Sequence, residues 1–444
     1  MPTDPPRENR EFDLVLVGAT GFVGRLTAAH LARSAPAELR IALAGRNESR
    51  LVDVRRTLPD AAADWPLVVV DTLDEVAVRR LARRTRAVVT TVGPYAEYGR
   101  HLLGACAAAG THYADLTGEV LFVRDMIDRH HATAQDTGAR IVTSCGFDSV
   151  PSDLGVFLTA QRAAEDGEGT LEETVLHVRS MRGGMSGGTV DSMRRQFAEM
   201  GQDRERAAIV ADPFGLSPDR DAEPDRHDAG RPASDTGTPP SQAAPGPLGR
   251  LRRLASASPV RRDASSDTWH APFFMAGYNT RIVRRSNALF GHGYGKTFHY
   301  REVMKAGAGL KGRLRAYAIA GALAGGFAAL GSQKARPIVE RLVPKPGSGP
   351  DEKSRVNGFF RMDLRTTTTT GARYRGIVAA QGDPGYNATV VMLAEAALTL
   401  AEGDLPQLPT GADGGVLTPA VALGMPYVER LRARDFTLEA TKLS

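Results

Sequence analysis

The sequence predicts an α/β protein made of an N-terminal, doubly wound parallel sheet and a second domain of mixed α+β structure. Three observations support this prediction. The chain has 444 residues, which is too long for one typical core. Short apolar runs alternate with helical patterns over residues 1–150, as in parallel strands joined by helices. After residue 150 the segments that alternate apolar and polar residues are longer, as in antiparallel strands.

The opening strand and turn are the most informative part of the first domain. The apolar run at residues 14–17 leads into Gly18, Gly21 and Gly24, and helical spacing of apolar residues follows. Such glycines allow a sharp turn, close approach to a pyrophosphate and tight helix–strand packing, and the helix dipole then favours the phosphates. The spacing is a variant of the common GxGxxG, so a purely structural turn is the alternative. The Rossmann-type site is expected to use Gly18, Thr20, Gly21, Phe22, Val23 and Gly24.

The cofactor type is indicated by the end of the second expected strand, residues 40–44. An acidic residue there usually binds the ribose diol of NAD, whereas an arginine suits the 2′-phosphate of NADP. The sequence has Arg46 at this point, and Asn47 is a candidate N-cap for the next helix. We therefore predict NADP and assign Arg46 and Asn47 to its site. A solvated arginine is the alternative.

The fourth expected strand, residues 87–91, runs into Gly93, Pro94 and Tyr95. Ligands of open α/β sheets bind at the carboxyl ends of the strands. Gly93 and Pro94 are therefore assigned to the cofactor site as well.

The second half contains an expected strand at residues 171–182 and a glycine-rich turn at 183–189 around Ser186. This turn either brings backbone close to a ligand or is a mobile loop. Residues 215–268 have no aromatic residue and are rich in Pro, Ser, Asp, Arg and Ala, which predicts a disordered insertion. The second domain is accordingly expected over residues 151–214 and 269–400.

Composition narrows the class of protein. The net charge of +5 is a small difference between 56 basic and 51 acidic residues, so it does not indicate a nucleic-acid partner. Cys106 and Cys145 have neither the spacing of metal ligands nor a disulfide-rich pattern, so no metal is expected and a reducing cytosol fits them. The first residues are polar and contain no secretion signal. A cytoplasmic protein is the expectation, and its oligomeric state is left open.

An uncharged stretch from Ala316 to Gln333 is rich in Ala and Gly and is a poor transmembrane candidate. It is interpreted either as a helix packed on the protein through small residues or as a helix on a membrane surface. Upstream arginines at 250–262 would add weak, salt-sensitive attraction to an anionic plasma membrane, or would only keep the linker solvated.

Several motifs, in this order, resemble the saccharopine dehydrogenase-like oxidoreductases, and most closely the branch of trans-acting enoyl reductases of lipid synthesis. The resemblance covers nearly the whole chain except residues 215–268. The matching segments are residues 18–24 (GATGFVG), 44–47 (AGRN), 92–95 (VGPY), 113–119 (YADLTGE), 146–153 (GFDSVPSD), 186–189 (SGGT) and 414–420 (GGVLTPA).

The resemblance implies an NADP-binding Rossmann domain, a mixed second domain and a C-terminal segment, residues 401–444, that packs back toward the first. It also implies reduction of an acyl-thioester intermediate in lipid or glycolipid biosynthesis, carried on a polyketide synthase that lacks its own reductase. Two alternatives stay open: reduction of an amino-acid conjugate, as in saccharopine metabolism, and a non-catalytic NADP-binding sensor or scaffold. None of the ten tyrosines has a lysine four residues later, which argues against a short-chain dehydrogenase.

Reduction of an enoyl thioester needs hydrogen-bond donors for the developing enolate oxygen and a proton for Cα. Tyr95 and Ser186 are the catalytic candidates for the donors. Alternatively, Tyr95 only packs under the nicotinamide. Asp115, Glu119 and Asp148 are expected to brace loops, with proton transfer as the alternative role.

Overall fold

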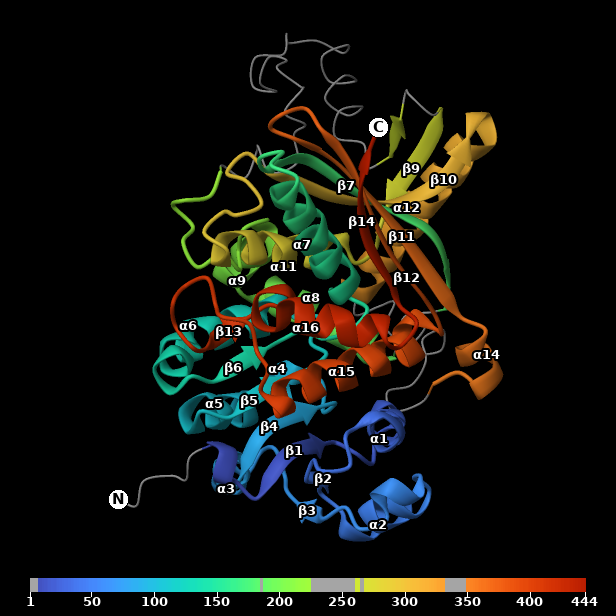
Figure 1. The fold of residues 1–444 in the computed structure, drawn as a ribbon. Helices are drawn as coiled ribbons and strands as arrows, with labels where there is room; N and C mark the ends of the chain where they lie inside the picture. Colours follow the sequence, from blue (N-terminus) through green and yellow to red (C-terminus); the bar gives the residue numbers. More distant parts are fainter. Residues whose placement is uncertain (1–6, 184–186, 225–259, 264–266, 332–348) are drawn as a thin grey trace.

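The computed structural model describes residues 7–183, 187–224, 260–263, 267–331 and 349–444. It consists of two seven-stranded sheets with helices packed between and around them (Figure 1). The first sheet is parallel and the second is mixed, so the predicted fold class is confirmed.

The first sheet has the strand order β13-β6-β5-β4-β1-β2-β3. The strands are β1 (Phe12–Val17), β2 (Ile41–Gly45), β3 (Leu67–Val69), β4 (Thr85–Thr90), β5 (His112–Ala114), β6 (Arg140–Val142) and β13 (Gly415–Leu417). Every residue of β1 and of β2 is buried, which explains why these strands read as continuous apolar runs. The strand order reverses between β1 and β4, the position at which sheets of this kind bind ligands.

Helices cover both faces of this sheet. On one side α3 (Glu75–Arg83), α5 (Arg100–Ala109) and α6 (Val120–Thr137) pack in series. On the other, α1 (Phe22–Ser34) packs on α15 (Thr389–Glu402), which also contacts β1, β4 and β5. Residues 389–400 were expected to belong to the second domain. In the structure they form most of α15, which packs on the first sheet instead. Nearly all of α15 is buried, because the helix lies between the sheet and α16 (Pro419–Arg432).

A buried ion cluster joins these three helices. Glu395 on α15 is 1% exposed and lies 2.9 Å from His30 Nε2 on α1. Its carboxylate also accepts hydrogen bonds from Arg430 at 3.0 Å and from Arg434 at 2.7 Å. Burial alone would raise the pKa of Glu395, but these hydrogen bonds hold that pKa below its usual value. The C-terminal helices are therefore tied to the first domain by charge as well as by packing.

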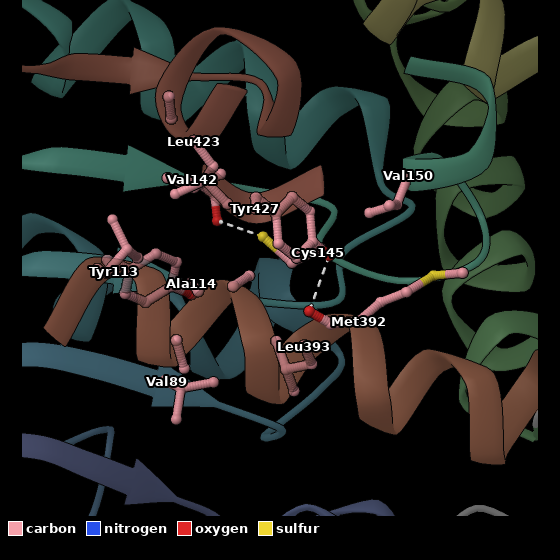
Figure 2. Packing of buried hydrophobic residues seen from close by; sticks show 14 of the residues in the cluster. Val89, Tyr113, Ala114, Val142, Cys145, Val150, Met392, Leu393, Leu423 and Tyr427 are labelled. Atoms are coloured by element: carbon pink, nitrogen blue, oxygen red, sulfur yellow. Dashed lines mark hydrogen bonds between the residues drawn. The ribbon is translucent and has the colours of Figure 1, made fainter. Parts of the chain in front are cut away.

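Apolar packing continues without a break from the first sheet into these helices. Figure 2 shows Val89, Tyr113 and Val142 of the sheet against Leu393 on α15 and Tyr427 on α16. Both cysteines are buried and free, and burial raises the pKa of the Cys145 thiol well above its ordinary value. These thiols are packing groups and not nucleophiles.

The second sheet has the strand order β14-β12-β11-β7-β10-β9-β8. Its strands are β7 (Leu171–Arg182), β8 (Arg261–Asp263), β9 (Thr268–Pro272), β10 (His299–Ala308), β11 (Phe359–Thr368), β12 (Arg373–Gln381) and β14 (Thr437–Leu443). Only β7 and β10 are parallel neighbours, and the other described pairs are antiparallel. A hairpin joins β11 to β12 at Gly371, whose φ of +86° is one that glycine adopts readily.

One face of the second sheet is covered by α7 (Val150–Glu165), which packs on β7, β11, β12 and β14 and meets α11 (Ala276–Leu289) and α16. These helices separate the two sheets (Figure 1). The remaining elements are η1 (Arg7–Asn9), α2 (Glu48–Arg56), η2 (Asp60–Ala62), α4 (Tyr95–Tyr98), α8 (Gly187–Gln202), α9 (Arg204–Ala211), α12 (Gly309–Gly331), α14 (Glu352–Val356) and η4 (Pro384–Ala388).

The insertion predicted at residues 215–268 is wrong at both of its ends. Leu216 is fully buried, and its carbonyl oxygen accepts a hydrogen bond from Arg285 at 2.6 Å. At the other end, β8 and the start of β9 belong to the second sheet. Buried arginines on α11 order this backbone without any aromatic residue, which a composition argument does not detect. Residues 225–259 and 264–266 lie outside the described part of the chain.

The uncharged stretch predicted as a helix forms most of α12, and its last residues fall outside the described part. Ala316 is buried against β9 and β10, and Phe327 contacts Phe197 of α8 with ring centroids 5.9 Å apart. The helix is therefore packed on the protein along one side. No helix within the described ranges combines the length and the apolar character needed to cross a membrane.

Candidate functional site

A cavity of about 560 Å³ lies at the carboxyl edge of the first sheet. The turns that follow β1, β2, β4, β5 and β6 form one side of it. The end of β7, the start of α8, the residues before α11 and η4 form the other side. Both halves of the molecule therefore contribute walls to one site.

The glycine turn fits a dinucleotide. Gly18 has φ +88°, and a methyl group on it would lie 2.8 Å from Thr91 Oγ1. A methyl group on Gly24 would overlap the carbonyl oxygen of Gly18. Gly21 is the N-cap residue of α1 and has no side chain to cap the helix, and a Cβ there would meet only the Gly18 oxygen, at 3.3 Å. The first turn of α1 thus presents backbone N–H groups to the cavity, as a phosphate site requires. Thr20, Phe22 and Val23 also line the cavity, and their contact with the cofactor stays a prediction.

Of the two residues assigned to the 2′-phosphate end of the cofactor site, Arg46 lines the cavity and Asn47 does not. Arg46 follows β2, is exposed and lines the cavity, as a partner for a 2′-phosphate should. Asn47 is not among the cavity residues, and its Oδ1 accepts a hydrogen bond from Arg50 N at 3.0 Å. Asn47 is thus the N-cap of α2, and the structure gives it no position in the cofactor site.

Gly93, Pro94 and Tyr95 line the cavity at the end of β4. The hydroxyl of Tyr95 donates to the Thr90 carbonyl at 3.2 Å and accepts from Leu116 N at 3.1 Å. Burial raises the pKa of Tyr95 well above its ordinary value. Because the hydroxyl donates its proton to a backbone carbonyl, it is not free to donate to a substrate in this structure. Ser186 lies outside the described residues, although Gly183 and Gly187 on either side of it line the cavity.

Two buried carboxyl groups hold the cavity walls together. Glu119 accepts hydrogen bonds from Tyr95 N at 2.9 Å, from Ala96 N at 2.8 Å and from Ser192 Oγ of α8 at 2.7 Å. Asp115 accepts from the N–H groups of Thr117 and Ser144, both at 3.0 Å. Burial raises the pKa of Asp115 to about 7. Both residues brace loops, as their positions in the sequence indicated.

Asp148 differs from the other carboxyl groups of the cavity. Three carboxyl groups line the cavity: Asp71, Asp148 and Asp191. Asp71 accepts a hydrogen bond from Leu73 N at 3.0 Å. Asp191 is bound by Arg194 at 2.8 Å, and its pKa is lowered although burial opposes this. Within the described chain the half-buried carboxyl of Asp148 has no hydrogen bond or ion pair, and burial raises its pKa to about 6. Asp148 is therefore a carboxyl group that lines the cavity without a partner in the described chain, and its pKa lies above the ordinary value for an aspartate.

Large apolar side chains line both sides of the cavity. Phe22, Leu116 and Phe147 lie on the side of the first sheet, and those on the opposite side are Met181, Met193, Phe274, Met275 and Tyr386. Several of these were not predicted, because they come from segments far apart in the sequence and carry no motif. Arg46 is the one cationic side chain among the described residues that line the cavity.

Comparisons with known proteins agree with this geometry. The family described as the saccharopine dehydrogenase NADP binding domain matches residues 14–142. A trans-acting enoyl reductase from Mycobacterium ulcerans is 44% identical over 441 residues, which cover 98% of this chain and 99% of that protein. One from Mycobacterium tuberculosis is 43% identical over 445 residues, with the same coverage of both chains.

A solved structure shows the same fold. Apo saccharopine dehydrogenase (L-Glu forming) from Saccharomyces cerevisiae superposes with a TM-score of 0.50 at 11% identity, covering 97% of this chain and 99% of that one. The match to the family domain confirms NADP as the cofactor. The chain belongs to the saccharopine dehydrogenase-like oxidoreductases, in the branch of the trans-acting enoyl reductases.

Proposed function

We propose that the protein is an NADPH-dependent enoyl reductase that saturates the C=C bond of an acyl thioester carried on a separate polyketide synthase, in lipid or glycolipid biosynthesis. The observation that carries this proposal is one cavity that combines a phosphate-binding turn after β1, an unpaired carboxyl group in the turn after β6, and apolar side chains from both halves of the molecule. The names of the relatives support the same reaction.

The cofactor half of the site is formed by the glycine turn and Arg46. The N–H groups at the start of α1 would hold the pyrophosphate, and Arg46 would hold the 2′-phosphate. When bound, NADPH supplies the hydride that reaches Cβ of the substrate.

The substrate half suits an acyl chain better than an amino-acid conjugate. An amino-acid conjugate with several carboxylates would need several cationic partners, whereas Arg46 is the one cation among the described cavity residues. Phe147, Met181 and Phe274 instead offer apolar contact.

Asp148 is the proposed source of the proton for Cα. Its carboxylic acid gives up a proton to Cα as the enolate collapses, becomes a carboxylate and is reprotonated from water. Ser186, and not Tyr95, remains the proposed donor to the enolate oxygen, because the Tyr95 hydroxyl is bound to backbone.

The proposed reaction is tested by single-turnover mixing of the NADPH-loaded protein with crotonyl-N-acetylcysteamine and longer enoyl thioesters. We expect NADPH absorbance to fall only when a thioester is present, with the saturated thioester as product. No oxidation at any chain length would favour the non-catalytic sensor, and oxidation without thioester would contradict the proposed reaction.

Replacing Asp148 by Asn tests the proton donor. We expect Asp148→Asn to slow NADPH oxidation by about 10²–10⁴-fold without changing NADPH affinity. The wild-type rate should fall as pH rises through about 6, because the proton-bearing form of Asp148 is lost, whereas the variant should show no such dependence. Asp71→Asn is the control and should keep the pH dependence. An unchanged pH profile in Asp148→Asn would remove Asp148 from the reaction.

Replacing Arg46 by Ala tests the cofactor site. A charge-assisted contact to phosphate contributes about 1.5–3 kcal/mol, so NADPH should bind about 10- to 100-fold more weakly to Arg46→Ala while NADH is little affected. Fluorescence titration measures both affinities. Arg50→Ala, one helical turn away and exposed, is the control and should change neither. Equal losses for both cofactors would show that Arg46 does not contact the 2′-phosphate.

We further propose that the protein works in the cytoplasm and binds anionic membranes weakly through α12. Leu310 and Leu314 on this helix are 70% and 64% exposed, and Lys311 and Arg315 lie beside them. Each basic residue near an anionic surface adds about 1 kcal/mol, screened by salt. The apolar side chains and the charges would then act on one lipid surface.

Flotation with anionic vesicles tests this association. We expect binding at low salt that is lost at high salt and in the Leu310→Glu, Leu314→Glu double variant. The control is Leu73→Glu with Val76→Glu, which changes two exposed apolar residues at the start of α3. No wild-type binding at low salt would contradict the proposal and leave the reductase untouched.

A further inference from the structure

The second sheet has one face covered by α7 and an opposite face that carries many positive charges. Along β11 the buried Phe360 and Leu364 lie on the covered side, and the exposed Arg361 and Arg365 lie on the other. The same alternation on β7, β10 and β12 adds further cations to this outer face. We define the basic face as Arg179, Arg301, Lys305, Arg361, Arg365 and Arg375.

Two carboxylates pair with these cations, and the register places a third, the exposed Glu439 of β14, on the same face. Asp363 lies at the centre of the basic face and is 1% exposed, because arginines cover it. Arg375 donates to both of its oxygens, at 2.7 and 2.9 Å, and Arg179 Nε lies 3.8 Å away. Glu173 pairs with Arg301 at 3.1 Å. Within the described chain, Arg361, Arg365 and Lys305 have no acidic partner.

The register of the strands places like charges side by side. Arg365 on β11 is directly opposite Arg375 on β12, and both Arg365 and Arg301 flank Val175 on β7. Like charges directly opposite one another destabilise a sheet. The two nearby histidines do not add to the charge at neutral pH, since burial lowers the pKa of His177 to about 4 and also lowers that of His270. A negatively charged partner would relieve the repulsion between these arginines.

The basic face also leads to the cavity. Strand β7 continues from Arg179 to Met181, and Met181 and Gly183 line the cavity. Four residues of extended chain span about 13 Å at about 3.3 Å per residue. A molecule bound on the basic face would therefore lie about one short strand length from the reaction site.

We propose that the basic face docks an acidic protein surface, that of the carrier domain that holds the acyl thioester. This inference rests on the proposed function, which requires a substrate attached to a second protein. Arginine outnumbers lysine on the face, and arginine forks bind carboxylates in pairs, as Arg375 does with Asp363. A second copy of this chain fits less well, because a two-fold contact would bring the same cations together.

The test reverses two charges that have no acidic partner in the described chain. We expect Arg361→Glu with Arg365→Glu to reduce kcat/KM for a crotonyl-loaded acyl carrier domain of the synthase by at least about tenfold and to leave crotonyl-N-acetylcysteamine unchanged. The matched control is Arg33→Glu with Arg80→Glu, two exposed arginines on α1 and α3 with the same change in net charge. The control should affect neither substrate.

Binding of the carrier domain without an acyl group, measured by interferometry over a salt series, separates docking from catalysis. If the wild type reduces neither substrate, the proposed function fails, and a tenfold loss of carrier affinity in the variant still supports docking. Equal carrier affinity in the variant and wild type overturns the proposal. A wild-type dimer that becomes monomeric in the variant, or vesicle binding lost with carrier binding intact, also overturns it.

Discussion

The close contact between the Gly18 turn and helix α1 is the constraint on which the site depends. Gly24 packs directly on the Gly18 carbonyl, where no larger residue fits. Thr91 Oγ1 donates to the same carbonyl oxygen at 3.2 Å, so the end of β4 is fixed against the turn as well. The direction of α1, and with it the N–H groups that face the cavity, follows from this contact. The ion cluster at Glu395 then holds α15 and α16 on α1.

Buried carboxyl groups extend this order to the second half of the molecule. Glu119 joins the turn after β4 to Ser192 on α8, so one side chain fixes walls from both halves of the cavity. Asp115 fixes the loops after β5 and β6. Burying a carboxyl group costs free energy unless the group forms hydrogen bonds, and both Glu119 and Asp115 form them. Asp148 differs from both, because its carboxyl group lines the cavity and has no hydrogen bond or ion pair within the described chain.

Local patterns in the sequence were sufficient for the strands of the first sheet within residues 1–150 and for the glycine turn, because each depends on residues close together in the chain. The contact of Arg46 with a 2′-phosphate stays a prediction. Local patterns did not predict the segments whose structure depends on a contact with residues far away in the sequence. Arg285 orders the backbone at Leu216, and the sheet recruits α15 from the far end of the sequence. Asn47 was expected both to cap the next helix and to bind the cofactor, and the structure shows only its role as the N-cap of α2. The role of the Tyr95 hydroxyl depended on the Thr90 carbonyl and the Leu116 N–H, and no pattern indicates the latter contact.

The total charge of the chain conceals how its charges are distributed. The net value of +5 is unremarkable for 444 residues, yet the cavity wall has one cation in its described part, whereas six lie on the basic face. In the proposed arrangement, an apolar interior binds the acyl chain without competing for its charged carrier, and a charged exterior attracts the carrier without drawing its acidic groups into the cavity. Recognition of the chain and recognition of its carrier are thereby separated in space. Substitutions on the basic face should leave the cavity unchanged, and substitutions in the cavity should leave the basic face unchanged. No described ion pair joins the basic face to the residues that line the cavity.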